Sequence, residues 1–120
     1  MEIYTCQMAR HRVASVQGIP VYDTTIKSGT GLFRPEWNIV LGYKSEEITQ
    51  EEYTAGYKAI LRDSYRESRA EWLEFLQRDK VAVMCYCKAG SFCHRYLLID
   101  VLRKVAAKHD IPFTYMGEIK

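Results

Sequence analysis

A buried strand followed directly by a helix is the feature that most limits how this chain can fold. Residues 81–87 read VAVMCYC, an uninterrupted apolar and β-prone run of the length expected for a strand covered on both faces. After a short turn, apolar residues recur at helical spacing from Tyr96 to Val105. In open α/β sheets, the loop that leaves the carboxyl end of such a strand binds ligands. We therefore expect a strand, a ligand-binding loop and a helix.

The first turn of this helix is predicted to attract anions. Its backbone N–H groups have no partner within the helix and carry a partial positive charge. His94 and Arg95 lie in the same turn, and Lys88 precedes it in the loop. Ser91 is placed to cap the helix by accepting the N–H of His94. The sequence thus predicts an anion-binding corner.

Length and charge indicate one ordinary domain over residues 1–120. The formal net charge is +2, a near balance that argues against a protein that coats nucleic acid. No apolar run approaches the roughly 20 residues that cross a bilayer, and the first residues lack the pattern of a signal peptide. We therefore expect a cytoplasmic protein without a membrane partner, whose four cysteines are thiols.

Further strands and helices alternate along the chain. The expected elements are strands over residues 2–6, 21–26 and 113–116, and one bent helix or two consecutive helices over residues 49–76. A capping box opens the helical region at Thr49, and residues 7–16 stay unassigned. This alternation predicts an α/β fold, a small Rossmann-like sandwich with a mostly parallel sheet and helices on both faces.

Residues 27–44 are predicted to form a long loop, of the kind that serves as a lid or a binding loop. Lys27 and Arg34 offer positive charge, and Ser28 and Gly29 offer hydrogen bonds. Phe33 and Trp37 offer faces for a planar ring. The alternative is that Trp37 and its apolar neighbours, Phe33 among them, pack over a sheet edge while the cations stay in water.

Asp23 falls near the end of a predicted inner strand, which is an unusual place for a carboxylate. The simpler role is to cap a turn or to pair with a cation, and the functional alternative is contact with a ligand hydroxyl. The carboxyl ends of parallel strands share one rim, so several residues could meet in one pocket there. These residues are Cys6, Asp23, Thr24, Lys27, Cys87, His94 and Arg95.

The cysteines after position 84 form a pattern with their neighbours. Cys85, seven further residues and then Cys93-His94-Arg95 follow a hydrophobic strand, and this spacing resembles the signature of the DUF488 family. Residues 23–29, 33–37 and 52–54 resemble its short phage-type members, so the resemblance covers most of the chain. Many members carry a Glu two residues after the first Cys, where this chain has Cys87. The resemblance implies a nucleotide- or nucleic-acid-linked pocket and a role against bacterial defence, in the host cytoplasm.

Two of the chemical roles open to this corner use the sulfur atoms. A zinc site could use Cys85, Cys87, Cys93 and His94, although adjacent Cys93 and His94 are expected to point in different directions. A cysteine nucleophile is the second role, with Cys93 activated by the helix N-terminus and by His94. In that enzyme Asp23 and His94 could also move protons.

Two other roles need no reaction. Arg95 and His94 could hold a phosphate while Trp37 or a tyrosine stacks on a base. Alternatively, Cys85 and Cys93 are small packing residues and Arg95 ties the loop to Asp23 or to a carbonyl group.

Binding is the role that we expect. The predicted function is binding of a phosphate-bearing nucleotide derivative, with no metal or cofactor, in a phage anti-defence protein that sequesters a nucleotide immune signal. A Cys/His-dependent enzyme acting on a nucleotide or nucleic acid is the alternative. Zinc bound at the corner is a further alternative. We do not expect a nucleic-acid partner, but we do expect a homo-oligomer. The predicted ligand-binding residues are Arg95, His94, Ser91, Lys88, Lys27, Ser28, Asp23, Arg34, Trp37 and Cys87. The catalytic candidates are Cys93, His94 and Asp23.

Overall fold

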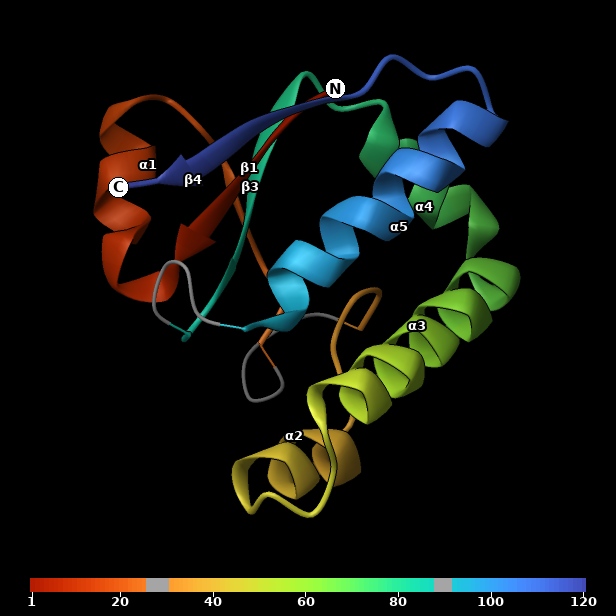
Figure 1. Cartoon of the computed structure of the whole chain (residues 1–120). Helices are drawn as coiled ribbons and strands as arrows, with labels where there is room; N and C mark the ends of the chain where they lie inside the picture. The colour runs from red at the N-terminus through yellow and green to blue at the C-terminus, as the bar shows by residue number, and fades with distance from the viewer. Residues whose placement is uncertain (26–30, 88–91) are drawn as a thin grey trace.

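Parallel strands form the centre of the protein (Figure 1). A computed structural model describes residues 1–25, 31–87 and 92–120. Within these residues the sheet has the order β2-β3-β1-β4, and each neighbouring pair is parallel. The strands are β1 (Glu2–Gln7), β2 (Val21–Asp23), β3 (Lys80–Cys85) and β4 (Thr114–Ile119). The expected parallel sheet is therefore confirmed.

Helices cover both faces of this sheet. In Figure 1, α1 lies to the left of the strands, α3, α4 and α5 lie to the right, and α2 lies below them. The helices are α1 (His11–Val16), α2 (Trp37–Lys44), α3 (Gln50–Glu67), α4 (Arg69–Leu76) and α5 (His94–Lys108), and a 3-10 turn, Met8–Arg10, precedes α1. The α/β sandwich is confirmed. The short α1 covers one face, α3, α4 and α5 contribute to the layer on the other, and α2 packs against α3. No helix in the described ranges is both long and apolar enough to span a bilayer.

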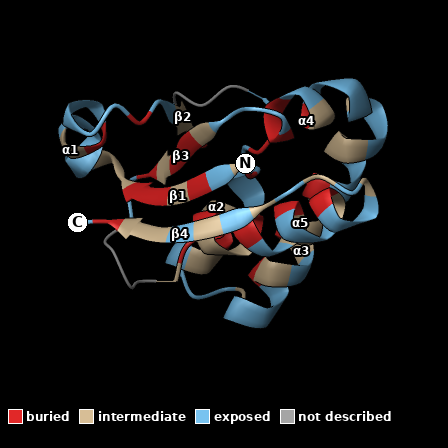
Figure 2. Ribbon diagram, turned by 90° about the horizontal axis from the view of Figure 1, so that it is seen from above, coloured by how far each residue is buried: buried red, intermediate tan, exposed pale blue. Residues whose placement is uncertain are grey.

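β3 is the central strand that the apolar run predicts. Val81 and Val83 are fully buried against the large helical layer, while Ala82 is fully buried on the α1 side. The strand ends at Cys85, two residues earlier than expected, and Cys87 is exposed. Figure 2 shows the buried residues concentrated along the central strands and on the helices that pack against them.

The prediction of a long loop over residues 27–44 is wrong from Trp37 onward, because α2 begins there. A glycine within an aperiodic segment favoured a loop, but Gly42 is buried in the helix and faces the side chain of Ile48. Phe33 is fully buried, and its carbonyl accepts the hydroxyl of Tyr57 at 2.6 Å. Phe33 therefore packs as the simpler interpretation of this segment expected, whereas Trp37 is 47% exposed.

The helical region after Thr49 consists of two helices, α3 and α4, which meet at Ser68. Both hydrogen bonds of the capping box are present: Thr49 Oγ1 accepts the N–H of Glu52 at 3.1 Å, and Glu52 Oε1 accepts the N–H of Thr49 at 3.0 Å. The predicted start of this region is therefore confirmed.

A β-bulge in β4 decides which face of the sheet its last residues meet. Ile3 of β1 pairs with Tyr115, but Tyr4 pairs with Gly117, so one residue of β4 is skipped. Gly117 has φ of 101°, a conformation that side chains rarely adopt. Because strand residues alternate between faces, this skip places Glu118 opposite Thr5, on the same side of the sheet as α5. In an unbulged strand, Glu118 would lie opposite Cys6 and face α1.

We predict that Gly117→Ala lowers the free energy of unfolding by about 1–2 kcal/mol, because a Cβ at positive φ strains the backbone. No atom lies within 4 Å of the position that the added Cβ would take, so the cost is conformational and not steric. Urea denaturation followed by circular dichroism measures it. The exposed Gly31, which also has no atom within 4 Å, is the matched control, and equal losses in both variants would contradict the prediction.

Candidate functional site

The candidate site lies where β3 ends and α5 begins. α5 starts at His94, and its N-cap is Cys93, whose backbone is extended with φ of −156° and ψ of 148°. No side chain caps this helix in the described residues. Ser91 and Lys88 themselves lie outside the described residues, as do Lys27 and Ser28 of the earlier loop.

Two cysteines and a histidine converge at this point. The sulfur atoms of Cys85 and Cys93 lie in contact, as in a disulfide, and the two Cα atoms are 8.0 Å apart. The Cys93 sulfur lies 3.8 Å from Nδ1 of His94. The sulfur atoms and a ring nitrogen of His94 lie within 4.8 Å of one another, and all three residues are buried. Cys6 and Cys87 are free thiols.

Thr24 fixes the orientation of the His94 ring. Nε2 of His94 lies 3.0 Å from both the hydroxyl oxygen and the carbonyl oxygen of Thr24. The Thr24 hydroxyl donates its own proton to the carbonyl of Met84 at 2.8 Å, so towards His94 it can only accept. His94 must therefore carry its proton on Nε2, which leaves the lone pair of Nδ1 directed towards Cys93.

His94 is neutral at pH 7. Burial lowers the pKa of His94 to about 4; the Thr24 hydrogen bond opposes the shift, the Arg95 charge adds to it, and the Asp23 charge opposes it. The imidazole therefore offers a lone pair at Nδ1 and no positive charge for an anion. The expectation that His94 holds a phosphate as a cation thus needs correction.

Arg95 is fully buried, and all five of its N–H groups are used inside the protein. Nε and one Nη2 proton bind the two carboxylate oxygens of Glu118, at 3.3 and 2.9 Å. Nη1 donates to the Cys85 sulfur and to the Cys87 carbonyl, each at 2.8 Å, and Nη2 also donates to the Tyr96 hydroxyl. The expectation that Arg95 contacts a ligand phosphate therefore needs correction. Arg95 instead positions the residues around it.

Glu118 completes this network from β4. Burial opposes its ionisation, but the hydrogen bonds and the charge of Arg95 outweigh burial, so the pKa of Glu118 is lower than usual. The Tyr96 hydroxyl donates to Glu118 at 3.1 Å, and the Arg95 guanidinium also lies over the Tyr96 ring, 4.6 Å from its centroid. Three structural elements, β3, α5 and β4, are thus joined by one buried cation.

The cluster opens onto a cavity of about 190 Å³. Its walls include the rings of Tyr43, Tyr53 and Phe92, whose centroids lie 5.1–5.7 Å from one another. Among the described residues that line it, Lys44 is the one with a formal charge. The remaining lining residues are Thr25, Pro35, Val40, Cys85, Tyr86, Cys87, Cys93 and His94.

The structure brings together only part of the predicted site. Cys93, His94 and Cys87 line the cavity, whereas Arg34, Trp37 and Asp23 are not among its described lining residues. The Asp23 carboxylate accepts the backbone N–H of Thr25 at 2.8 Å, which is the turn-capping role that the simpler interpretation expected. Trp37 lies on α2 with nearly half of its surface exposed and contributes no ring to the cavity wall.

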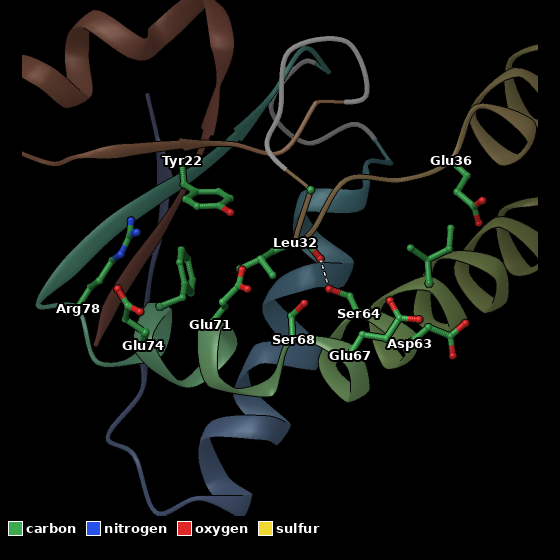
Figure 3. A pocket seen from close by; sticks show the side chains of 13 residues that line it. Tyr22, Leu32, Glu36, Asp63, Ser64, Glu67, Ser68, Glu71, Glu74 and Arg78 are labelled. Carbon is green, nitrogen blue, oxygen red and sulfur yellow. Dashed lines mark hydrogen bonds between the residues drawn. The ribbon is translucent and has the colours of Figure 1, made fainter.

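A larger groove of about 680 Å³ lies elsewhere, along α3 and α4 (Figure 3). Figure 3 shows carboxylates directed into it from both helices, and Arg78 is the cation among its described lining residues. The acidic lining residues are Glu36, Asp63, Glu67, Glu71 and Glu74. Such a surplus of negative charge repels phosphate, so the groove does not suit the ligand that the sequence suggested.

Sequence reasoning missed the partners of the cluster. Tyr53 belongs to an aromatic series at helical spacing that indicated core packing, and Phe92 and Tyr43 had no distinguishing pattern. Glu118 left one signal, since a carboxylate inside the apolar strand that follows α5 needs a cation as partner. Thr24 was expected at the same rim as His94, but its hydrogen bonds to the imidazole were not predicted, because they depend on the position of His94.

We predict that Glu118→Gln lowers the free energy of unfolding by about 3 kcal/mol, because it leaves the buried Arg95 without a counter-charge. Urea denaturation at pH 7 measures the change. Asp100→Asn is the matched control, since it removes a pair with Arg103 in which both side chains are more than half exposed. The control is expected to change stability by less than about 1 kcal/mol. A Glu118→Gln effect no larger than that of the control would refute the structural role of the pair.

Comparison with known families shows one match. The description of the matching family is the active DUF488-N3 subclade, and the match covers residues 2–106. This range contains Cys85, Cys93, His94 and Arg95, while Glu118 lies beyond it. Comparisons with curated proteins and with solved structures gave no match. The match extends over most of the sequence, and the chain therefore belongs to the DUF488 family.

Proposed function

We propose that this protein is an enzyme that acts on a small nucleotide-derived molecule bound in the 190 Å³ cavity. One observation carries the proposal: the sulfur atoms of Cys85 and Cys93 and a nitrogen of His94 gather within 4.8 Å and line the same cavity. Such a cluster can attack, bind or protonate a substrate, whereas a purely structural core needs none of these groups. The matched subclade is described as active, which agrees with turnover.

The cavity walls support a planar, mostly uncharged substrate group. Tyr43, Tyr53 and Phe92 offer ring faces and edges against which a base can pack. The volume is smaller than the roughly 300–1,000 Å³ of sites for drug-sized ligands, so a base or a sugar fits better than a whole nucleotide. A phosphate would then remain near Lys44 at the cavity wall.

The contacts of Arg95 and His94 favour turnover over a phosphate clamp. Arg95 has no N–H group left for a ligand, and His94 carries no positive charge at pH 7. The neutral imidazole directs its lone pair at the Cys93 sulfur instead, from 3.8 Å. Both groups that would have bound a phosphate therefore act on the sulfur atoms of the cluster.

Storage without turnover is the second candidate function. In that case the protein sequesters a nucleotide immune signal, as a phage anti-defence protein would. The apolar and aromatic character of the described cavity wall favours it, because such a wall binds a base without any reaction.

We expect purified protein to change the mass of at least one member of a nucleotide panel. The reduced protein is incubated with each compound, then denatured by heat, and the released small molecules are identified by mass spectrometry. We predict that Cys93→Ser and His94→Gln each lower turnover at least about 100-fold, while the compound is still bound.

Cys6→Ser is the matched control, because Cys6 is buried on the α1 side of the sheet, away from the cavity. Its turnover should equal that of the unmodified chain. If every bound compound is released with its mass unchanged, the protein stores its ligand and the enzyme proposal fails.

A further inference from the structure

We infer that Cys85, Cys93 and His94 bind a divalent metal ion of the zinc class through two sulfur atoms and Nδ1. In tetrahedral coordination, bonds of roughly 2.3 Å to sulfur and 2.1 Å to nitrogen place these two ligands about 3.6 Å apart. The Cys93 sulfur and His94 Nδ1 are 3.8 Å apart, close to that spacing before any ion is bound. This site extends the proposed function and can be tested without any substrate.

The backbone explains how two adjacent residues can both be ligands. Side chains of neighbouring residues within a helix point in different directions, which is why the sequence argued against this pair. Cys93, however, is the N-cap and has extended backbone angles, whereas His94 is the first helical residue. The change of conformation between them turns both side chains towards the same point.

The distance between the two cysteine backbones also suits an ion better than a disulfide. The Cα atoms of Cys85 and Cys93 are 8.0 Å apart, while disulfides usually join Cα atoms about 4.4–6.8 Å apart. Two sulfur ligands of one zinc ion are roughly 3.8 Å apart, given bonds of about 2.3 Å. Side-chain rotation across an 8.0 Å gap can provide that spacing without moving the backbone.

Two of the three ligands, His94 and Cys85, are held by neighbours of the kind that supports metal sites. His94 donates Nε2–H to Thr24, which fixes the ring and leaves Nδ1 for the ion. Cys85 accepts an N–H from Arg95 at 2.8 Å, a contact that would also stabilise its thiolate as a metal ligand.

A divalent ion would be balanced in charge by the two sulfur ligands. Arg95 is neutralised by Glu118, which binds two of its nitrogen atoms. If both cysteines bind an ion as thiolates, their two negative charges have no counter-charge left from Arg95, and uncompensated charges are costly away from water. A divalent ion between Cys85 and Cys93 restores neutrality.

The remaining coordination position would face the substrate cavity, because all three ligands line it. Three protein ligands with one open position are typical of catalytic zinc sites, while structural sites use four protein ligands. Cys87 lines the same cavity and is exposed, so the site does not need it as a fourth ligand.

Metal binding to the full chain tests this inference directly. The reduced, metal-free protein is titrated with Co²⁺, and thiolate-to-cobalt charge-transfer absorption is recorded. We expect about one ion per chain, displaced by Zn²⁺, and elemental analysis of protein purified without chelator should find zinc in the same ratio. If the reduced chain gives no charge-transfer band and purifies without metal, the inference is overturned.

Substitutions of the three proposed ligands test which residues bind the ion. Cys85→Ser, Cys93→Ser and His94→Gln are each expected to weaken Co²⁺ binding at least about 100-fold, whereas Cys6→Ser keeps it unchanged. Circular dichroism checks that each variant is folded. If a variant does not fold, the Co²⁺ absorption spectrum of the unmodified chain decides whether the ion has thiolate ligands. Binding that survives all three substitutions would place the ion elsewhere and refute the assignment. A nucleotide panel that shows no turnover would leave a positive Co²⁺ titration intact, so this inference and the proposed function fail separately.

Discussion

The buried Arg95 is the group on which the arrangement of the site depends. A guanidinium placed away from water is tolerated only when its charge is balanced and its N–H groups have acceptors. Glu118 provides the balance, and Cys85, the Cys87 carbonyl and Tyr96 provide the other acceptors. The end of β3, the start of α5 and the end of β4 therefore cannot move independently, and Cys85 is held facing Cys93.

That network in turn depends on the bulge at Gly117. The side-chain alternation of a regular strand would direct Glu118 towards α1, on the face opposite Arg95. Skipping one residue directs Glu118 towards α5 and Ile119 towards Cys6 and the α1 layer. The carboxylate that meets Arg95 therefore comes from β4 and not from the residues that follow Cys85.

Burial gives the two basic residues of the Cys-His-Arg motif roles that their charges alone do not suggest. Arg95 uses its N–H groups in internal contacts, and His94 loses its charge and keeps a lone pair directed at sulfur. The site consequently combines sulfur atoms and a neutral imidazole beside a small aromatic cavity. The larger groove between α3 and α4 has the opposite character, since its carboxylates attract cations.

Local patterns in the sequence determined the elements themselves. The apolar run of β3, the periodicity of α5 and the capping box at Thr49 each act within a few residues, so they could be predicted from neighbours alone. The same patterns identified Cys93 and His94 as site residues, because strand, turn and helix place them at the carboxyl end of the sheet. α2 was missed because a buried glycine looks the same in sequence as a flexible one.

Only the tertiary structure decided what those residues do. Arg95 meets a carboxylate 23 residues away, across a strand pairing and a bulge that no local pattern indicates. The cavity walls join Tyr43 and Tyr53 to Phe92, and Thr24 orients an imidazole 70 residues later. Such contacts depend on how the elements pack, and packing is set by the whole chain, whereas propensity and periodicity act within a single element.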